Sequence, residues 1–248
     1  MKTASQTILE RRSIRRYERE QLTDEQLEFI HEAIRHTPTS YNGQQFSVID
    51  IDDQPLKERL YEQTHQKQIK TCAHFFAFCA DFHKITVAAK AKGVDMPPVC
   101  DTADGLLIGT IDASLAMMNA LTAAEALGLG TCCIGYARTA APEAIAQELG
   151  LPDQVYLVCG LAVGVPRELP DLKPKQPASL LIHRNRYSEE RMAEALLDYD
   201  REVTRYNSTR SGAKTDNDWI AHMAGYYAEA MGYTMLEALR RRGFDPKR

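Results

Sequence analysis

Short runs of apolar residues with the spacing of β-strands lie at residues 46–51, 74–80, 131–134 and 155–163. The run 74–80 is apolar at consecutive positions, so both of its faces are expected to be covered and the strand should be central in its sheet. The run 155–163 has the same character and is expected to be buried as well. The pattern therefore predicts a small sheet of about four strands.

A larger part of the chain shows the helical period of about 3.6 residues. In the clearest case Thr23 and Gln26 form a capping box, and Leu27, Ile30 and Ile34 follow on one face to about His36. Further helices are expected at residues 5–11 with Ser5 as the cap, 55–63, 106–129, 142–150, 188–206 and 218–241. The stretches before residue 106 and at 166–177 contain prolines and are expected to be irregular. Many helices around few strands predict an α+β or α/β fold, and the surplus of helices favours a second subunit that buries them.

The run 106–129 is long and apolar enough to be compared with a membrane span. Its interior carries Asp112, Asn119 and Glu125, which would be costly in hydrocarbon. No basic residues flank it as they flank many membrane helices. We therefore predict a buried core helix.

Composition narrows the class of protein. The 248 residues carry 30 basic and 34 acidic side chains, a net charge of −4, which gives no global reason to bind nucleic acid or an anionic membrane. The N-terminus lacks the apolar region of a secretory signal, and the six cysteines contain no C-x-x-C pair. Reduced thiols and a cytoplasmic location are expected. Cys132 and Cys133 could form a redox pair, but neighbours on a strand point to opposite faces.

Basic residues cluster at the start of the chain. If the segment is extended, Arg11, Ser13 and Arg15 project to one side. Two guanidinium groups and a hydroxyl on one side suit a phosphate dianion. The alternative is a solvated basic turn that pairs with Glu18 and Glu20.

Three other segments are candidates for ligand contacts. Residues 37–46 form a hydroxyl- and amide-rich loop, residues 131–136 form a strand that ends at Gly135, and Lys173 and Lys175 flank a proline. The alternatives are an ordinary turn for the first two and a basic linker for the third. Phosphate-binding glycine motifs, nucleophile elbows and metal-binding histidine motifs are absent from the sequence, so hydrolytic and metal chemistry have no support.

Taken in order, these segments resemble the FMN-dependent nitroreductase family, in particular its oxygen-insensitive NADPH nitroreductases and NADPH–flavin oxidoreductases. The resemblance covers nearly the whole chain, through residues 11–15, 38–44, 66–67, 78–81, 128–135, 160–166, 171–174 and 209–219.

The resemblance implies an α+β fold with a mixed sheet and flanking helices, in which two subunits form an intertwined homodimer. It implies a single domain over residues 1–248, whose helical extension from about residue 187 to 248 packs on the partner and over the active site. The implied FMN-binding residues are Arg11, Arg12, Ser13, Arg15, Lys173 and Lys175 near the phosphate and nearby flavin atoms, Thr39, Ser40 and Gln44 from the partner, Gln66 at the pyrimidine, and Ile134, Gly135 and Tyr136 through their backbone. Arg210 matches the residue that receives the 2′-phosphate of NADPH.

The implied activity is ping-pong transfer of hydride from NADPH, or NADH, through flavin N5 to nitroaromatics, quinones or similar small acceptors. No side chain is required as a catalytic acid, and Arg15 is expected to tune flavin N1 and O2. The alternatives are a reductase that releases reduced flavin and a flavin-binding module without activity. The sequence departs from the family pattern at Arg11, Tyr136, Lys175 and Thr215, the last of which stands where a second basic residue is expected.

Overall fold

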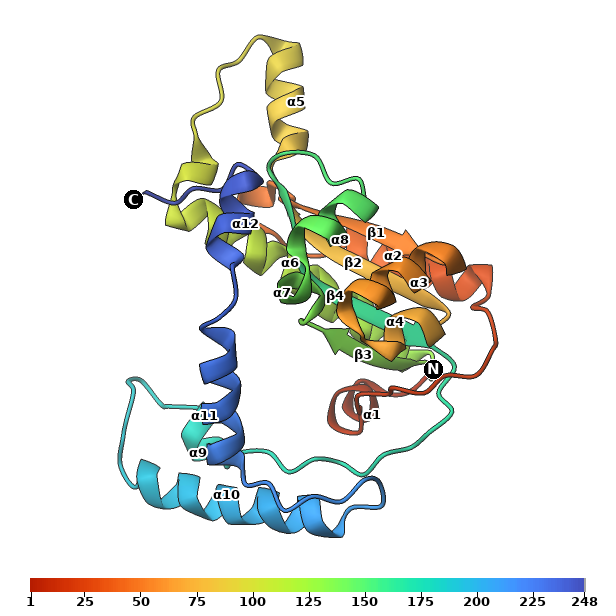
Figure 1. Cartoon of the computed structure of the whole chain (residues 1–248), viewed down its shortest axis with the longest axis vertical. Helices are drawn as coiled ribbons and strands as arrows, with labels where there is room; N and C mark the ends of the chain where they lie inside the picture. Colours follow the sequence, from red (N-terminus) through yellow and green to blue (C-terminus); the bar gives the residue numbers. More distant parts are fainter. Residues whose placement is uncertain (248) are drawn as a thin grey trace. The chain divides into compact units, whose positions relative to one another are not determined.

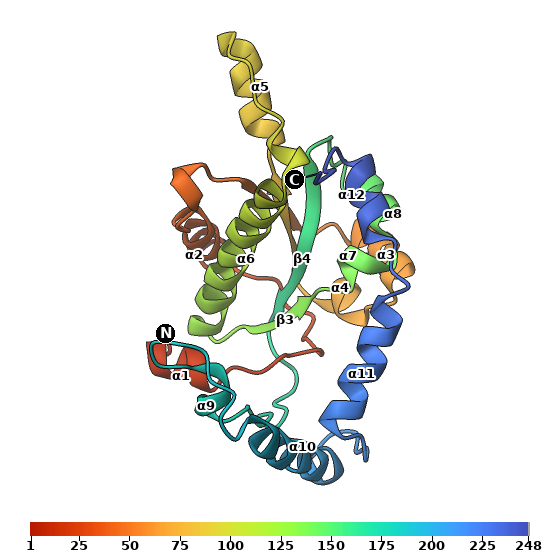
Figure 2. The ribbon, with the colours of Figure 1, turned by 90° about the vertical axis from the view of Figure 1, so that its left-hand side faces the viewer.

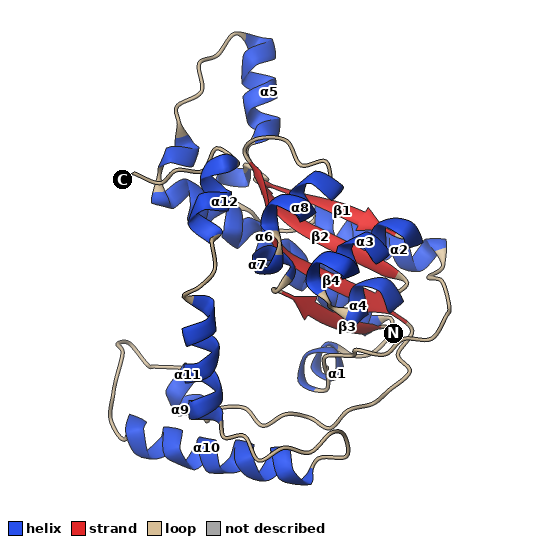
Figure 3. Cartoon of the chain, viewed as in Figure 1, coloured by secondary structure: helices blue, strands red, loops and turns tan. Residues whose placement is uncertain are grey.

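The computed structural model describes residues 1–247 as a set of helices around one small sheet (Figures 1 and 3). The elements in chain order are α1 (Ala4–Leu9), α2 (Asp24–Arg35), η1 (Ser40–Asn42), β1 (Phe46–Ile51), α3 (Gln54–Thr64), α4 (Lys67–Thr71), β2 (His74–Asp81), α5 (His83–Lys92), η2 (Val99–Asp101), α6 (Ala103–Ala126), β3 (Gly130–Ile134), α7 (Ala137–Ala140), α8 (Pro142–Glu148), β4 (Val155–Gly164), α9 (Ala178–Leu181), α10 (Met192–Thr209), α11 (Trp219–Ala230) and α12 (Met235–Arg241).

The four strands pair in the order β1-β2-β4-β3, and every neighbouring pair is antiparallel. β2 and β4 are buried along their whole length, as their consecutive apolar residues predicted. Among the described residues, parallel pairing occurs in one bridge, between Ser13 and Thr131 at the outer edge of β3. The sheet is therefore mixed through this bridge.

Helices cover both faces of the sheet. Figure 2 shows the sheet nearly edge-on, with α2 and α6 on one side and α3, α4, α7 and α8 on the other. Two apolar cores fill the two layers, one centred on Phe76 and Phe78, the other on Phe75 and Ile69. A layer of helices on each face of an antiparallel sheet confirms the α+β prediction.

α6 is the central helix of the fold, as the apolar run predicted. It packs closely on the sheet, because a Cβ added to Gly109 would lie 2.8 Å from the Cβ of Ala80 and 2.9 Å from the ring of Phe82. By length and composition alone α6 is the one helix of residues 1–247 that could cross a membrane.

Two predicted helices differ from the structure, and one helix was missed. The first helix begins at Ala4, and its cap is Thr3 in a capping box with Gln6, whereas Ser5 lies inside the helix. α5 was not predicted because its exposed, lysine-rich sequence has no apolar stripe. The predicted helix 218–241 is two helices, since the chain turns at Gly232 between α11 and α12.

The chain folds as two compact units, one made of residues 1–168 with the C-terminal stretch from Thr234, the other of residues 169–233. In the first unit the C-terminal stretch is anchored by Phe244, whose ring lies 6.1 Å from that of Phe82 and 4.9 Å from that of Tyr156. In the second unit α10 packs against α11. The packing of residues 187–248 on a partner subunit stays a prediction.

Candidate functional site

The basic segment near the N-terminus lies extended along the free edge of β3. The backbone N–H of Ile14 donates to the carbonyl oxygen of Thr131 at 2.8 Å, and Ser13 bridges the same residue. The Ile14 side chain is buried against Gly130, where an added Cβ would come within 2.9 Å of it. Because residues alternate along an extended chain, Ser13 and Arg15 project away from the side that Ile14 buries.

The same segment is anchored at its far end by Tyr17. The buried Tyr17 hydroxyl donates to the carbonyl oxygens of Ile14 at 2.7 Å and Ala162 at 3.3 Å. Burial raises the pKa of Tyr17 far above its ordinary value, so the hydroxyl stays a donor. Arg15 donates its backbone N–H to the carboxylate of Glu168 at 2.7 Å. The path of the segment is therefore fixed from Ser13 to Tyr17.

Arg11 and Arg12 carry unused hydrogen-bonding capacity. The Nε atom of each is buried and has no hydrogen-bond partner within residues 1–247. Orphaned buried donors are costly, and a bound anion is one way to satisfy them. An anion held beside the segment would satisfy the Nε donors that have no partner within residues 1–247, so these residues are compatible with a phosphate group, and their role stays a prediction.

A buried acid balances part of this charge. The carboxylate of Glu125 accepts a 2.7 Å hydrogen bond from the Thr131 hydroxyl and lies 3.8 Å from the Lys2 ammonium. Burial raises the pKa of Glu125, against the opposing effect of the Thr131 hydrogen bond and of the charges on Lys2, Arg11 and Arg12. The carboxylate therefore lies within electrostatic reach of the basic segment.

The loop between α2 and β1 carries Thr39, Ser40 and Gln44. The backbone N–H of Gln44 donates to the Thr39 hydroxyl at 3.1 Å. Asp112, on α6, accepts hydrogen bonds from the backbone N–H groups of Ser40 at 3.1 Å and Gln45 at 3.3 Å. The loop is thus fastened to the core helix at both ends.

The predicted contacts at Gln66 and at residues 134–136 lie on the face of the sheet that is covered by α3, α4, α7 and α8. Gln66 is half-buried at the start of α4, and its backbone N–H donates to the Thr64 hydroxyl at 3.3 Å. Ile134 ends β3 in the core, and Tyr136, exposed, begins α7. A Cβ added to Gly135 would meet no atom within 4 Å, so open space lies beside that residue.

The basic segment and the loop 39–45 lie at opposite corners of the sheet. Phe46 pairs with Ala80, which pairs with Tyr156, whereas Ser13 and Thr131 lie opposite Val163. Seven residues of β4 separate these two rows, which is about 23 Å, and the outer strands are about 14 Å apart. Within one chain the two groups of predicted contacts are therefore too far apart to touch one mononucleotide.

In the second unit, Lys173 and Arg210 line one hollow. Its wall includes Tyr199 and Trp219, whose rings meet edge to face at 5.4 Å. Arg210 ends α10 and donates its Nε–H to the carbonyl oxygen of Ala213 at 2.5 Å. Thr215 lines the same hollow, whereas the exposed Lys175 does not.

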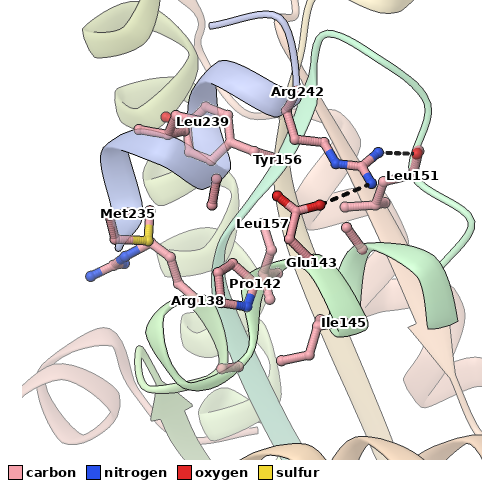
Figure 4. A pocket seen from close by; sticks show the side chains of 13 residues that line it. Arg138, Pro142, Glu143, Ile145, Leu151, Tyr156, Leu157, Met235, Leu239 and Arg242 are labelled. Carbon is pink, nitrogen blue, oxygen red and sulfur yellow. Dashed lines mark hydrogen bonds and ion pairs between the residues drawn. The ribbon is translucent and has the colours of Figure 1, made fainter. Parts of the chain in front are cut away.

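A second hollow lies in the first unit and is lined by none of the predicted residues (Figure 4). Arg242 of α12 points toward Glu143 of α8 at 4.0 Å and donates to the Leu151 carbonyl oxygen at 2.6 Å. The remaining walls are mostly apolar, as at Ile145 and Leu239. These contacts fasten the C-terminal helix to the core.

The two adjacent cysteines face opposite ways, as predicted. Cys132 is buried and Cys133 is exposed. Burial raises the pKa of the Cys132 thiol against the charge of Arg15, and neighbouring groups that partly cover the sulfur of the otherwise exposed Cys133 raise the pKa of its thiol against the charge of Arg11. Both are therefore held as thiols rather than as reactive thiolates.

Sequence reasoning did not find the roles of Asp112 and Glu125. It used both acids as evidence against a membrane span, and the structure shows each making a specific contact. The available signal was a charged residue inside an apolar helix. This signal does not identify the partner, because Ser40 lies 72 positions away from Asp112 in the chain.

Comparison with known proteins gives one consistent result. The model of the Nitroreductase family matches residues 8–165, and that of the Nitroreductase family, C-terminal domain, matches residues 173–247. The chain is 36% identical over 236 residues to the oxygen-insensitive NADPH nitroreductase of Salmonella typhimurium, with 94% of each chain covered. It is 31% identical over 246 residues to an FMN reductase (NAD(P)H) of Bacillus subtilis, with 98% of each chain covered. Among solved structures, B. megaterium NfrA2 is similar with a TM-score of 0.93 and 33% identity over 100% of both chains.

Proposed function

The chain belongs to the nitroreductase family, and we propose that it is an FMN-dependent oxidoreductase that uses NADPH or NADH to reduce small acceptors such as nitroaromatics and quinones. The names of the relatives, an NADPH nitroreductase and an FMN reductase, support this activity. The observation that carries the proposal is the pair of buried, unpartnered Nε atoms on Arg11 and Arg12 beside β3.

The basic segment would hold the FMN phosphate. Arg11, Arg12 and Arg15 offer three positive charges, and Ser13 offers a hydroxyl on the exposed side of the segment. Charge-assisted hydrogen bonds of this kind contribute about 1.5–3 kcal/mol each. Lys173 and Lys175 are proposed as further phosphate contacts on the family resemblance alone.

When bound, FMN supplies two-electron chemistry, in which reducing equivalents from the nicotinamide are passed to the acceptor. The positive charge of Arg15 would favour negative charge on the flavin at N1 and O2. Gln66 would contact the pyrimidine edge, and the backbone at Ile134, Gly135 and Tyr136 would approach the ring, beside the open space at Gly135. No side chain of this chain is required to deliver a proton.

The same geometry supports the proposal of a homodimer. Since Thr39, Ser40 and Gln44 lie at the corner of the sheet opposite the basic segment, they would reach a flavin held by the partner subunit rather than their own. α6 also exposes a stripe at helical spacing, with Leu107 56% exposed, Ile111 52%, Leu115 42% and Met118 45%. A second copy would cover this stripe, which favours a dimer over a membrane partner.

Arg210 would receive the 2′-phosphate of NADPH. Lys173 lines the same hollow, and Tyr199 and Trp219 give it an aromatic wall suited to a heterocycle. Thr215 stands in the hollow where a second cation would strengthen the preference for NADPH, so NADH is proposed as a usable donor. We place this enzyme in the cytoplasm and assign it no nucleic-acid partner.

A flavin reductase that releases reduced FMN is the second candidate, favoured by the name of the B. subtilis relative. The two functions differ in how tightly FMN is held. A reductase of that kind would lose FMN on gel filtration and turn over added flavin.

The test is anaerobic reduction of the purified protein. We expect a yellow protein that bleaches with NADPH and recolours when a nitroaromatic or a quinone is added. Protein that is colourless and gains no flavin absorbance when FMN is added contradicts the proposal. Slow bleaching with both nicotinamides despite tight FMN would instead indicate a flavin-binding module without activity.

A further inference from the structure

One buried carboxylate joins the core helix to both ends of the loop that precedes β1. Asp112 is 1% exposed and lies in an otherwise apolar part of α6, next to Ala113. Its Oδ1 atom accepts the backbone N–H of Ser40 at 3.1 Å, and its Oδ2 atom accepts that of Gln45 at 3.3 Å. Each oxygen of the carboxylate therefore has its own backbone donor, five residues apart.

The loop between these two donors is strained. Tyr41, Asn42 and Gln44 have φ values of 55°, 53° and 52°, in the left-handed region that residues with a Cβ seldom adopt. Such residues persist where surrounding contacts hold them. Inside the loop the Gln44 N–H bonds to the Thr39 hydroxyl, and the Lys84 ammonium bonds to the Gln44 carbonyl oxygen at 3.3 Å. At the second end the Asp81 N–H of β2 also donates to the Gln45 carbonyl oxygen at 3.1 Å, and the Asp112 contacts are those that join both Ser40 and Gln45 to α6.

The geometry of the site suits a carboxylate. The two N–H donors lie against different oxygens of Asp112, and an ionised carboxylate has acceptors only. A carboxamide of the same shape has one acceptor and would turn its NH₂ group toward one of the donors. Because Asp112 is buried, water has little access to replace the lost hydrogen bond.

We propose that Asp112 is a positioning residue that holds the loop 39–45 in the shape that presents Thr39, Ser40 and Gln44 to FMN. This inference rests on the proposed function, because the shape of the loop affects the reaction only through those contacts. Asp112 itself touches the loop backbone and acts through it.

The first experiment measures the loop without reference to flavin. Hydrogen exchange is followed by NMR in the full-length protein for Asp112→Asn and for Ser114→Ala, a control on the same helix whose hydroxyl bonds only to the Thr110 carbonyl oxygen. We expect the amides of Ser40 and Gln45 to exchange about tenfold faster in Asp112→Asn, with the amides of β2 unchanged in both variants. Unchanged loop exchange, or an equal acceleration in β2, would overturn the proposal.

If Asp112→Asn does not fold, the wild-type protein gives the answer. The amides of Ser40 and Gln45 should exchange at least about tenfold more slowly than that of Tyr41, which lies in the exposed loop tip. Exchange of all three at the same rate would contradict the clamp.

The second experiment measures FMN affinity by quenching of flavin fluorescence, below the melting temperature of each protein. We expect Asp112→Asn to bind FMN about tenfold more weakly than wild type, with Ser114→Ala unchanged. Equal affinity in Asp112→Asn and wild type would remove the positioning role while leaving the proposed function intact. Absence of FMN binding by the wild type would overturn both, and the exchange data would then report only a structural clamp.

Discussion

The backbone N–H of Ile14 lies 2.8 Å from the carbonyl oxygen of Thr131, and this hydrogen bond joins the N-terminal segment to the edge of β3. It determines which way the neighbouring side chains face, because residues alternate along an extended chain. Ile14 enters the core, whereas the next residue, Arg15, is exposed. The basic segment, for which a solvated turn was the alternative interpretation, is therefore extended along β3.

Arg15→Ala should weaken FMN binding because it removes a charge-assisted contact to the flavin. Loss of one such contact corresponds to about 10- to 100-fold in the dissociation constant. The matched control is Arg16→Ala, since Arg16 is the adjacent exposed arginine and its guanidinium lies 3.7 Å from Glu168. Fluorescence titration with FMN measures both variants. An equal loss in the two would mean that net charge, and not the position of Arg15, controls binding.

Arg210→Ala should raise the KM for NADPH and leave the KM for NADH nearly unchanged. The reason is that only NADPH carries the 2′-phosphate, and loss of one charged contact corresponds to about tenfold or more. Arg205→Ala is the control, an exposed arginine on the same helix that does not line the hollow. Steady-state kinetics with both nicotinamides are required. Equal changes with NADPH and NADH would reject the phosphate role.

The pattern of consecutive apolar residues predicted the central strands well, because β2 and β4 are covered on both faces of the sheet. It also predicted the capping box at Thr23, since both partners lie within one helical turn. Helix α5 was missed because it buries only Ala89, so its sequence has no apolar face with the helical period.

In the candidate site, too, local sequence rules predict some features and miss others. That Ser13 and Arg15 lie on the side opposite Ile14 follows from alternation and could be predicted, while the placement of Arg11 on that side stays a prediction. The contact of Asp112 with the loop joins residues far apart in the chain, and no local rule links a polar residue in a core helix to a particular loop. The opposite corners occupied by the two groups of contacts likewise depend on the strand order.

Ile111→Lys should convert the proposed dimer to monomers. Ile111 lies at the middle of the exposed stripe on α6, and a charge there would be buried without a partner if a second copy covers the helix. The FMN content should fall with it, because the loop 39–45 would no longer reach the partner's flavin. Size-exclusion chromatography with light scattering measures the mass. The control is Val87→Lys, at an exposed apolar position on α5, and an unchanged dimer in Ile111→Lys would place the interface elsewhere.

Asp50→Asn should destabilise the protein near neutral pH and much less in acid. The carboxylate of Asp50 on β1 lies 2.7 Å from His74 Nδ1 on β2 and 2.8 Å from His31 Nε2 on α2. Burial works to raise the pKa of Asp50, but the hydrogen bonds and charges of His74 and His31 outweigh it and the pKa is lowered. A carboxyl group whose pKa is lower in the folded state stabilises the protein above its unfolded pKa, about 4, and this stabilisation is lost as the pH falls toward the folded pKa. The free energy of unfolding of Asp50→Asn should therefore be about 1–2 kcal/mol below wild type at pH 6, and the difference should shrink below about pH 4.

Urea unfolding at several pH values measures this difference, with Asp52→Asn as the control for an exposed neighbouring carboxylate. A difference that stayed constant down to pH 3 would show that packing, and not the charge of Asp50, holds α2 to the sheet.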